Sequence, residues 1–173
     1  MKPAYQGKLD GLCGIYAIIN ALHYACDVSD EETLFRQALE SLAHRRWPSI
    51  LWMGMTIGDL RNIINRVLRQ NTEYELKVAY PFFKNPPRTN LGYWAHFDAI
   101  FDQPSARCAI IGITKPSLHW IVAWKDGKRI HFADSRPGNG VLRKNRSSLY
   151  AGERSKSGKK WLINRRELIV FHA

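Results

Sequence analysis

Apolar side chains recur every three or four positions through the first seventy residues of the chain. This spacing places them on one face of an α-helix, where they can be buried together. Near the N-terminus it predicts a helix over about residues 13–25, with a face made by Leu12, Ile15, Tyr16, Ile19 and Leu22. The first part of the chain is therefore expected to be mostly helical.

Two further helix starts are marked by capping residues. Ser29 lies three positions before Glu32, and this pair predicts a capping box that opens a second helix reaching about Arg46. Thr56 lies three positions before Asp59 and predicts the start of a third helix, whose apolar face continues towards residue 68.

The pattern changes in the second half of the chain, where short runs rich in β-formers alternate with turn residues. An aromatic segment over 91–101 predicts one short helix, and the turn Asp126-Gly127 predicts a β-hairpin. Residues 135–160 are rich in Gly, Ser, Arg and Lys and are expected to form mostly loop. The predicted strands are residues 74–83, 108–114, 118–124, 129–133 and 161–171.

Helices followed by an antiparallel sheet, segregated along the chain, indicate an α+β fold. The first helix is then expected to pack against the sheet. The chain has 173 residues, of which 45% are hydrophobic and 12% aromatic, and this is enough to bury a substantial core. A single domain over residues 1–173 is expected.

Positive charge is concentrated in the last third of the chain. The formal net charge is +11, and residues 125–166 hold thirteen Lys and Arg against three acidic residues. Such a field attracts acidic partners and can hold nucleic acid non-specifically. A solvated basic face that serves mainly solubility is the alternative interpretation.

The three cysteines, Cys13, Cys26 and Cys108, form no CxxC pair, which argues against a disulfide framework and a zinc site. No metal or other cofactor is predicted. The N-terminus lacks the apolar core of a signal peptide, and no window is apolar enough to cross a membrane. We expect a reducing, cytoplasmic setting or export by a route that needs no signal peptide.

Cys13 stands where the first helix is predicted to begin. The helix dipole favours negative charge at this end, so the position suits a thiolate nucleophile. Gly11 and Gly14, on either side, would let a substrate backbone approach closely. The alternative is that Cys13 is a small buried hydrophobic residue.

Candidate partners for the thiol lie in the predicted hairpin. His119 opens one strand and Asp134 ends the next, so the hairpin brings the two side by side. A carboxylate beside imidazole orients a base that takes the thiol proton. Gln6 precedes Cys13 by seven residues, and its amide and the Cys13 N–H could bind an oxyanion. Taken alone, His119 could be a core histidine and Asp134 a turn residue.

The order Gln6, Cys13, His119, Asp134 resembles that of the papain-like cysteine peptidase superfamily. The segment DGLCGIYAIINAL is similar to the openings of bacterial peptidases akin to the leader-cleaving domains of bacteriocin exporters. The small size and the short interval from His to acid resemble Josephin-type ubiquitin hydrolases. The resemblance implies a papain-like fold and thiol hydrolysis of an amide bond, with Cys13 as nucleophile, His119 as general base and acid, Asp134 as orienter and Gln6 in the oxyanion hole.

The leading hypothesis is a cysteine hydrolase that cleaves a peptide or isopeptide bond in a protein or peptide substrate. The basic residues of the last third of the chain suggest that this substrate has an acidic surface. The same residues would serve an acyl transferase or glutamine deamidase of the kind found among bacterial effectors and toxins. A basic nucleic-acid-binding module ranks lower, because the chain lacks the interleaved aromatic motif of RNA-binding sheets. An inactive peptidase-like scaffold is a further alternative.

Overall fold

The structure is a computed structural model that describes residues 11–28, 30–127, 129–136, 140–154 and 161–173. Within these ranges the chain forms five α-helices and a seven-stranded sheet, a mixed α+β arrangement as expected. The helices are α1 Cys13–Cys26, α2 Glu31–Glu40, α3 Ile50–Met53, α4 Ile57–Gln70 and α5 Asn90–Phe101. The strands are β1 Lys77–Ala79, β2 Ala106–Lys115, β3 His119–Asp126, β4 Arg129–Asp134, β5 Gly140–Lys144, β6 Leu149–Ala151 and β7 Trp161–His172.

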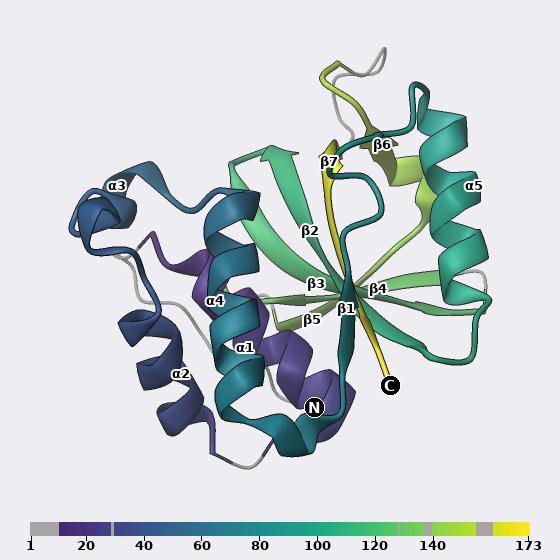
Figure 1. The fold of residues 1–173 in the computed structure, drawn as a ribbon. Coiled ribbons are helices and arrows are strands. Elements are labelled where there is room, and N and C mark those ends of the chain that lie inside the picture. Colours follow the sequence, from purple (N-terminus) through teal and green to yellow (C-terminus); the bar gives the residue numbers. More distant parts are fainter. Residues whose placement is uncertain (1–10, 29, 128, 137–139, 155–160) are drawn as a thin grey trace.

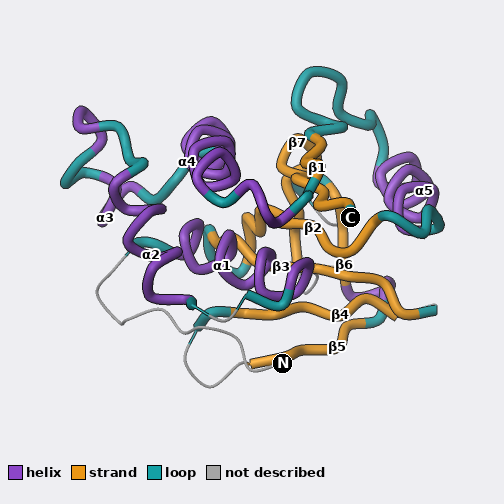
Figure 2. Tube along the Cα trace, turned by 60° about the horizontal axis from the view of Figure 1, so that its bottom comes forward, coloured by secondary structure: helices purple, strands orange, loops and turns teal. Residues whose placement is uncertain are grey.

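The strands lie in the order β1-β7-β2-β3-β4-β5, which can be followed across the sheet in Figure 2. Neighbours along this path are antiparallel, and the short β6 adds a parallel pairing to β7. β3 and β4 form the hairpin predicted at Asp126-Gly127, with Asp126 opposite Arg129. This hairpin fixes the position of the strand ends that carry His119 and Asp134.

Helices cover both faces of the sheet (Figure 1). α1, α2 and α4 bury their apolar sides in one core with alternate sheet residues such as Ile110 and Val122. The residues between them along the strands, such as Ile111 and Ile121, face a second core built with the aromatic side of α5. The strands β2, β3, β4 and β7 therefore supply apolar side chains to both faces of the sheet.

The predicted second helix differs from α2 at both ends. Ser29 lies outside the described residues, and Asp30 is the N-cap, its Oδ1 accepting a hydrogen bond of 2.9 Å from the Thr33 N–H. The reciprocal capping box occurs instead at Thr56 and Asp59, where α4 begins as predicted. α2 stops at Glu40 rather than near Arg46, because the Ser41 hydroxyl bonds back to the Gln37 carbonyl and a separate 3₁₀ turn follows over His44–Arg46.

One strand prediction and one loop prediction need correction. Of residues 74–83 only Lys77–Ala79 pairs with the sheet, because Glu75 before it adopts a left-handed conformation with φ of 44°. The expected loop over 135–160 contains β5 and β6. β5 is an edge strand that carries Arg143 and Lys144, and charged residues are common on sheet edges. Because the sequence of β5 is polar, it was interpreted as part of a loop.

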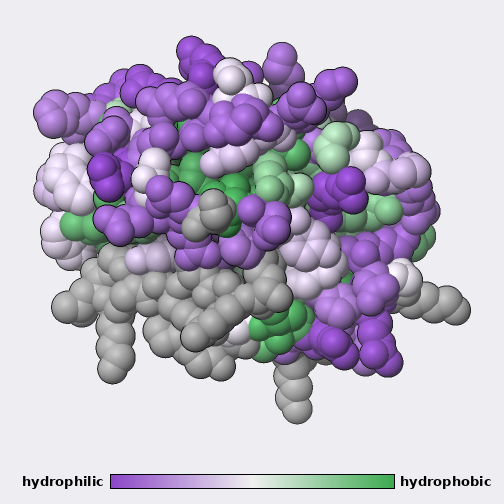
Figure 3. Space-filling model, turned by 90° about the horizontal axis from the view of Figure 1, so that it is seen from below, coloured by the Kyte–Doolittle hydropathy of each residue, from purple (hydrophilic) through white to green (hydrophobic). Residues whose placement is uncertain are grey.

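Figure 3 shows one face with hydrophilic residues around a small apolar area near its centre. In the described part of the chain, no helix has the length and apolar composition needed to cross a membrane.

Candidate active site

Cys13 is the first residue of α1, and its side chain is buried. The residue before it, Leu12, supplies no side-chain cap, and its carbonyl accepts the first helical hydrogen bonds, from Ile15 and Tyr16 at 2.8 and 3.2 Å. The N–H groups of Cys13 and Gly14 precede these bonds and therefore belong to the donors that a helix start leaves without intrahelical partners. Both the helix dipole and these donors favour negative charge beside the sulfur.

Gly11 and Gly14 accommodate the protein's own chain. A Cβ on Gly11 would lie 2.4 Å from the Leu51 carbonyl oxygen, and one on Gly14 would lie 2.7 Å from Met55 Sδ. The space beside these glycines is therefore filled by the protein itself and not left for a substrate backbone, as the sequence had suggested. They let the chain from α3 to the first turn of α4 pack closely against residues 11–14, which fixes the position of Cys13.

His119 and Asp134 meet at the ends of neighbouring strands. His119 is the first residue of β3 and Asp134 the last of β4, and both side chains are buried. The imidazole Nε2 and the carboxylate Oδ1 are 2.8 Å apart. The Cys13 side chain lies close enough to the imidazole to act on its pKa. Because Nε2 is engaged with Asp134, Nδ1 is the ring nitrogen available to the thiol.

These contacts set the protonation of the base. Burial acts to lower the pKa of His119, but the interactions of the imidazole with Asp134 and Cys13 outweigh burial, so the pKa is raised above 6.5. The arrangement therefore favours the imidazolium that would result from proton transfer out of the thiol.

Arg136 is a member of the cluster that the sequence interpretation missed. Its backbone N–H donates to Asp134 Oδ1 at 2.9 Å, and its Nη2 donates to Oδ2 at 2.9 Å. Its Nη1 donates to the Ser117 hydroxyl at 3.0 Å, in the turn that leads into His119. In the sequence, Arg136 stood in an apparent turn after Asp134, and only its two-residue separation from that acid hinted at pairing.

Arg136 and His119 together keep Asp134 ionised. Burial raises the pKa of the carboxyl group, but hydrogen bonds from His119 and Arg136 more than reverse this, so the pKa lies well below its usual range. Asp134 is thus a buried carboxylate with two cationic or potentially cationic neighbours. It can orient the imidazole without taking a proton itself.

Trp120 ties the site to the helical half of the molecule. Its indole Nε1 donates a buried hydrogen bond of 2.9 Å to the Met55 carbonyl, next to the capped start of α4. Because Trp120 follows His119, this bond fixes the strand end against the segment that also packs on Gly14. Gln6, the expected oxyanion-hole residue, lies outside the described residues.

The other two thiols have different surroundings. Burial raises the pKa of Cys26 to about 11, and that of the fully buried Cys108 is raised further, also by burial. All three cysteines are free thiols that form no disulfide. Among the described residues, no group of three or more His, Cys, Asp or Glu side chains is arranged to hold a metal ion.

Comparison of the chain with protein-family models and with curated proteins finds no match in either.

Proposed function

We propose that the protein is a papain-like cysteine hydrolase that cleaves a peptide or isopeptide bond through a covalent thioester. One observation carries the proposal: the His119 imidazole interacts with both the Cys13 side chain and the Asp134 carboxylate. A nucleophile, a base and a group that orients the base are the parts that thiol catalysis requires.

In the proposed reaction, Nδ1 of His119 takes the thiol proton and Cys13 Sγ attacks the substrate carbonyl carbon. The C–N bond then breaks, and the imidazolium gives its proton to the departing amine. Water next attacks the thioester carbonyl while the same nitrogen takes a proton from it. The acid is released and the proton returns to the sulfur. Asp134 stays ionised and supports the imidazolium in both steps.

Negative charge develops on the carbonyl oxygen during each attack and needs hydrogen-bond donors. The Cys13 N–H at the start of α1 is one proposed donor, and the side-chain amide of Gln6 is the other. The helix dipole adds to their effect because this oxygen would lie at the positive end of α1.

The thioester is the intermediate that tests this proposal. We expect incubation with libraries of activated peptide esters and ubiquitin-like conjugates to yield an acyl adduct on Cys13, detected by mass spectrometry of the intact and digested protein. Cys13→Ala should form no adduct, and His119→Ala should form it at least about a hundredfold more slowly. A Cys26→Ala control should behave as wild type. Turnover that persists in Cys13→Ala would contradict the proposal.

A further inference from the structure

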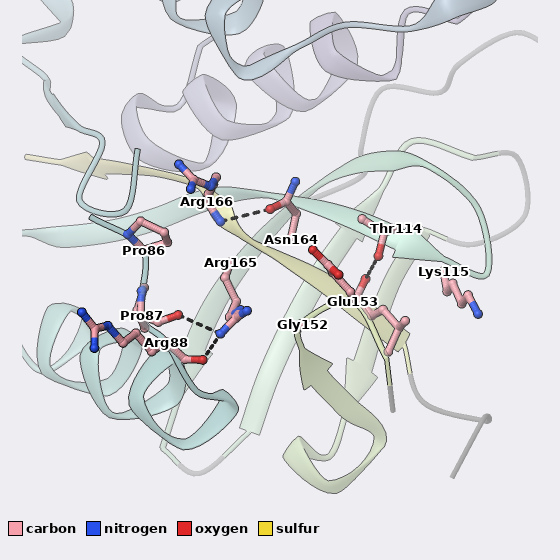
Figure 4. A pocket seen from close by; sticks show the side chains of 11 residues that line it. Pro86, Pro87, Arg88, Thr114, Lys115, Gly152, Glu153, Asn164, Arg165 and Arg166 are labelled. Carbon is pink, nitrogen blue, oxygen red and sulfur yellow. Dashed lines mark hydrogen bonds between the residues drawn. The ribbon is translucent and has the colours of Figure 1, made fainter. Parts of the chain in front are cut away.

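A separate pocket of about 540 Å³ lies beside the first half of β7. Its walls come from the loop before α5 at residues 86–88, the end of β2, the chain after β6 and the start of β7. Figure 4 shows Arg88 and Arg166 on one side and Lys115 on the other. Ile113, two residues before Lys115, pairs with His119, so the pocket and the candidate active site lie at the same end of the sheet.

An irregularity in β7 shapes this pocket. Ile111 pairs with Leu168 and Ile113 with Ile163, so four residues of β7, 164–167, face the single residue Gly112 of β2. The Glu167 carboxyl folds over Gly112, where a Cβ would clash with it. Such a bulge redirects the side chains of the bulged strand. Arg165 and Arg166 reach the pocket for this reason.

The pocket has an excess of positive charge. Its described lining contains Arg88, Lys115, Arg165 and Arg166 but a single carboxylate, that of Glu153. Arg165 is held by hydrogen bonds to the carbonyls of Pro87 and Arg88. In the described part of the chain, Arg88, Lys115 and Arg166 form no ion pair with any acidic side chain. Their charges are available to a ligand.

The lining favours carboxylates over nucleic acid. None of the described residues that line the pocket is aromatic, so it offers no ring on which a base could stack. Guanidinium groups bind carboxylates through paired hydrogen bonds. Because the pocket lies at the active-site end of the sheet, a polypeptide bound at one could extend to the other.

We propose that this pocket is an exosite that binds an acidic segment of the polypeptide substrate. That the bound polypeptide is a substrate rests on the proposed function, but its binding can be measured without catalysis. Arg88 and Arg166 provide the contacts to the carboxylates, and Arg165 keeps the 86–88 loop in place.

Binding of a fluorescein-labelled octaglutamate peptide to the Cys13→Ala protein, followed by fluorescence anisotropy, tests the exosite. We expect binding at about 0.02 M salt that is lost by about 0.5 M salt. Arg88→Glu/Arg166→Glu should raise Kd about tenfold or more. Arg66→Glu/Arg69→Glu makes the same charge change on the exposed side of α4, and it should change Kd less than about twofold.

Equal weakening in both double variants would overturn the proposal, because it would mean that general surface charge binds the peptide. Absence of binding at low salt would also overturn it. An oligothymidylate that binds more tightly than octaglutamate and depends on Arg88 and Arg166 would assign the pocket to nucleic acid instead. Circular dichroism of each variant checks folding. None of these outcomes depends on the thioester test, so the exosite can fail while the proposed function stands.

Discussion

Asp134 is a buried carboxylate that accepts hydrogen bonds from His119 at Oδ1 and from Arg136 at both of its oxygens. Asp134 and Arg136 carry opposite charges, so they act on the pKa of His119 in opposite directions. Asp134 raises the pKa of His119, whereas the guanidinium beside it offsets part of the negative charge that the imidazole experiences. Arg136 is therefore a positioning residue that also limits how strongly His119 holds its proton.

Removing the Arg136 charge should consequently raise the pKa of His119. We expect Arg136→Gln to move the NMR titration of the His119 imidazole to higher pH than in wild type. Arg136→Lys keeps the charge and should move it less, although it loses the paired contacts to the carboxylate. Identical titrations in wild type and Arg136→Gln would show that the guanidinium has no electrostatic influence on the base.

At the scale of elements, the position of Cys13 depends on how closely the chain from α3 to the first turn of α4 packs against residues 11–14. Gly11 touches the backbone of residues 50 and 51, and Gly14 touches Met55 and Leu60. The Trp120 bond to Met55 joins the same segment to β3. The thiol and the imidazole are thus held by one set of contacts between a helix, a short connecting segment and a strand end.

Adding a methyl group at Gly11 should disturb this packing. Gly11→Ala places Cβ against backbone atoms that cannot rotate away, so we expect a loss of about 1–3 kcal/mol in the free energy of unfolding. Gly58→Ala is a matched control in the first turn of α4, where the nearest atom is 3.6 Å from the added Cβ. It should raise stability by on the order of 0.5 kcal/mol. Urea denaturation measures both, and equal stability of the two variants would contradict the close packing at Gly11.

Sequence patterns predicted the elements whose signals are local. α1, α4, α5 and the β3–β4 hairpin are confirmed, because their apolar spacing, caps and turn residues agree with their surroundings. The spacing of apolar residues does not show whether Ser29 or Asp30 caps the start of α2. It also does not show that the Ser41 hydroxyl bonds back near the end of the helix. β5 was missed because an edge strand needs few apolar residues.

At the scale of the whole molecule, the candidate site joins residues that are far apart in the chain. Cys13 comes from the helical half and His119 and Asp134 from the sheet, and the structure brings these three predicted residues together. The same reasoning could not find Arg136, because its contacts to Asp134 and Ser117 depend on the path of the chain after β4. The basic pocket could not be predicted either, because it combines four separate segments with a bulge that no local sequence motif indicated.

The unpaired positive charges do not all lie in the basic region 125–166 that the sequence singled out. The pocket lining includes Arg88 and Lys115, which lie outside the basic region 125–166, along with Arg165 and Arg166 at its end. Lys125 and Arg146 in that region are instead paired with Asp98. Partner attraction should therefore depend on where cations are left unpaired rather than on net charge alone.

The reactivity of Cys13 tests the central claim most directly. Iodoacetamide alkylation from pH 5 to 9, mapped by mass spectrometry, should label Cys13 at least about tenfold faster than Cys26 or Cys108 near pH 6, because burial raises the pKa of those two thiols. His119→Ala should remove this advantage in a protein that is still folded. Labelling of Cys13 no faster than the other two cysteines, or at a rate unchanged by His119→Ala, would contradict the account.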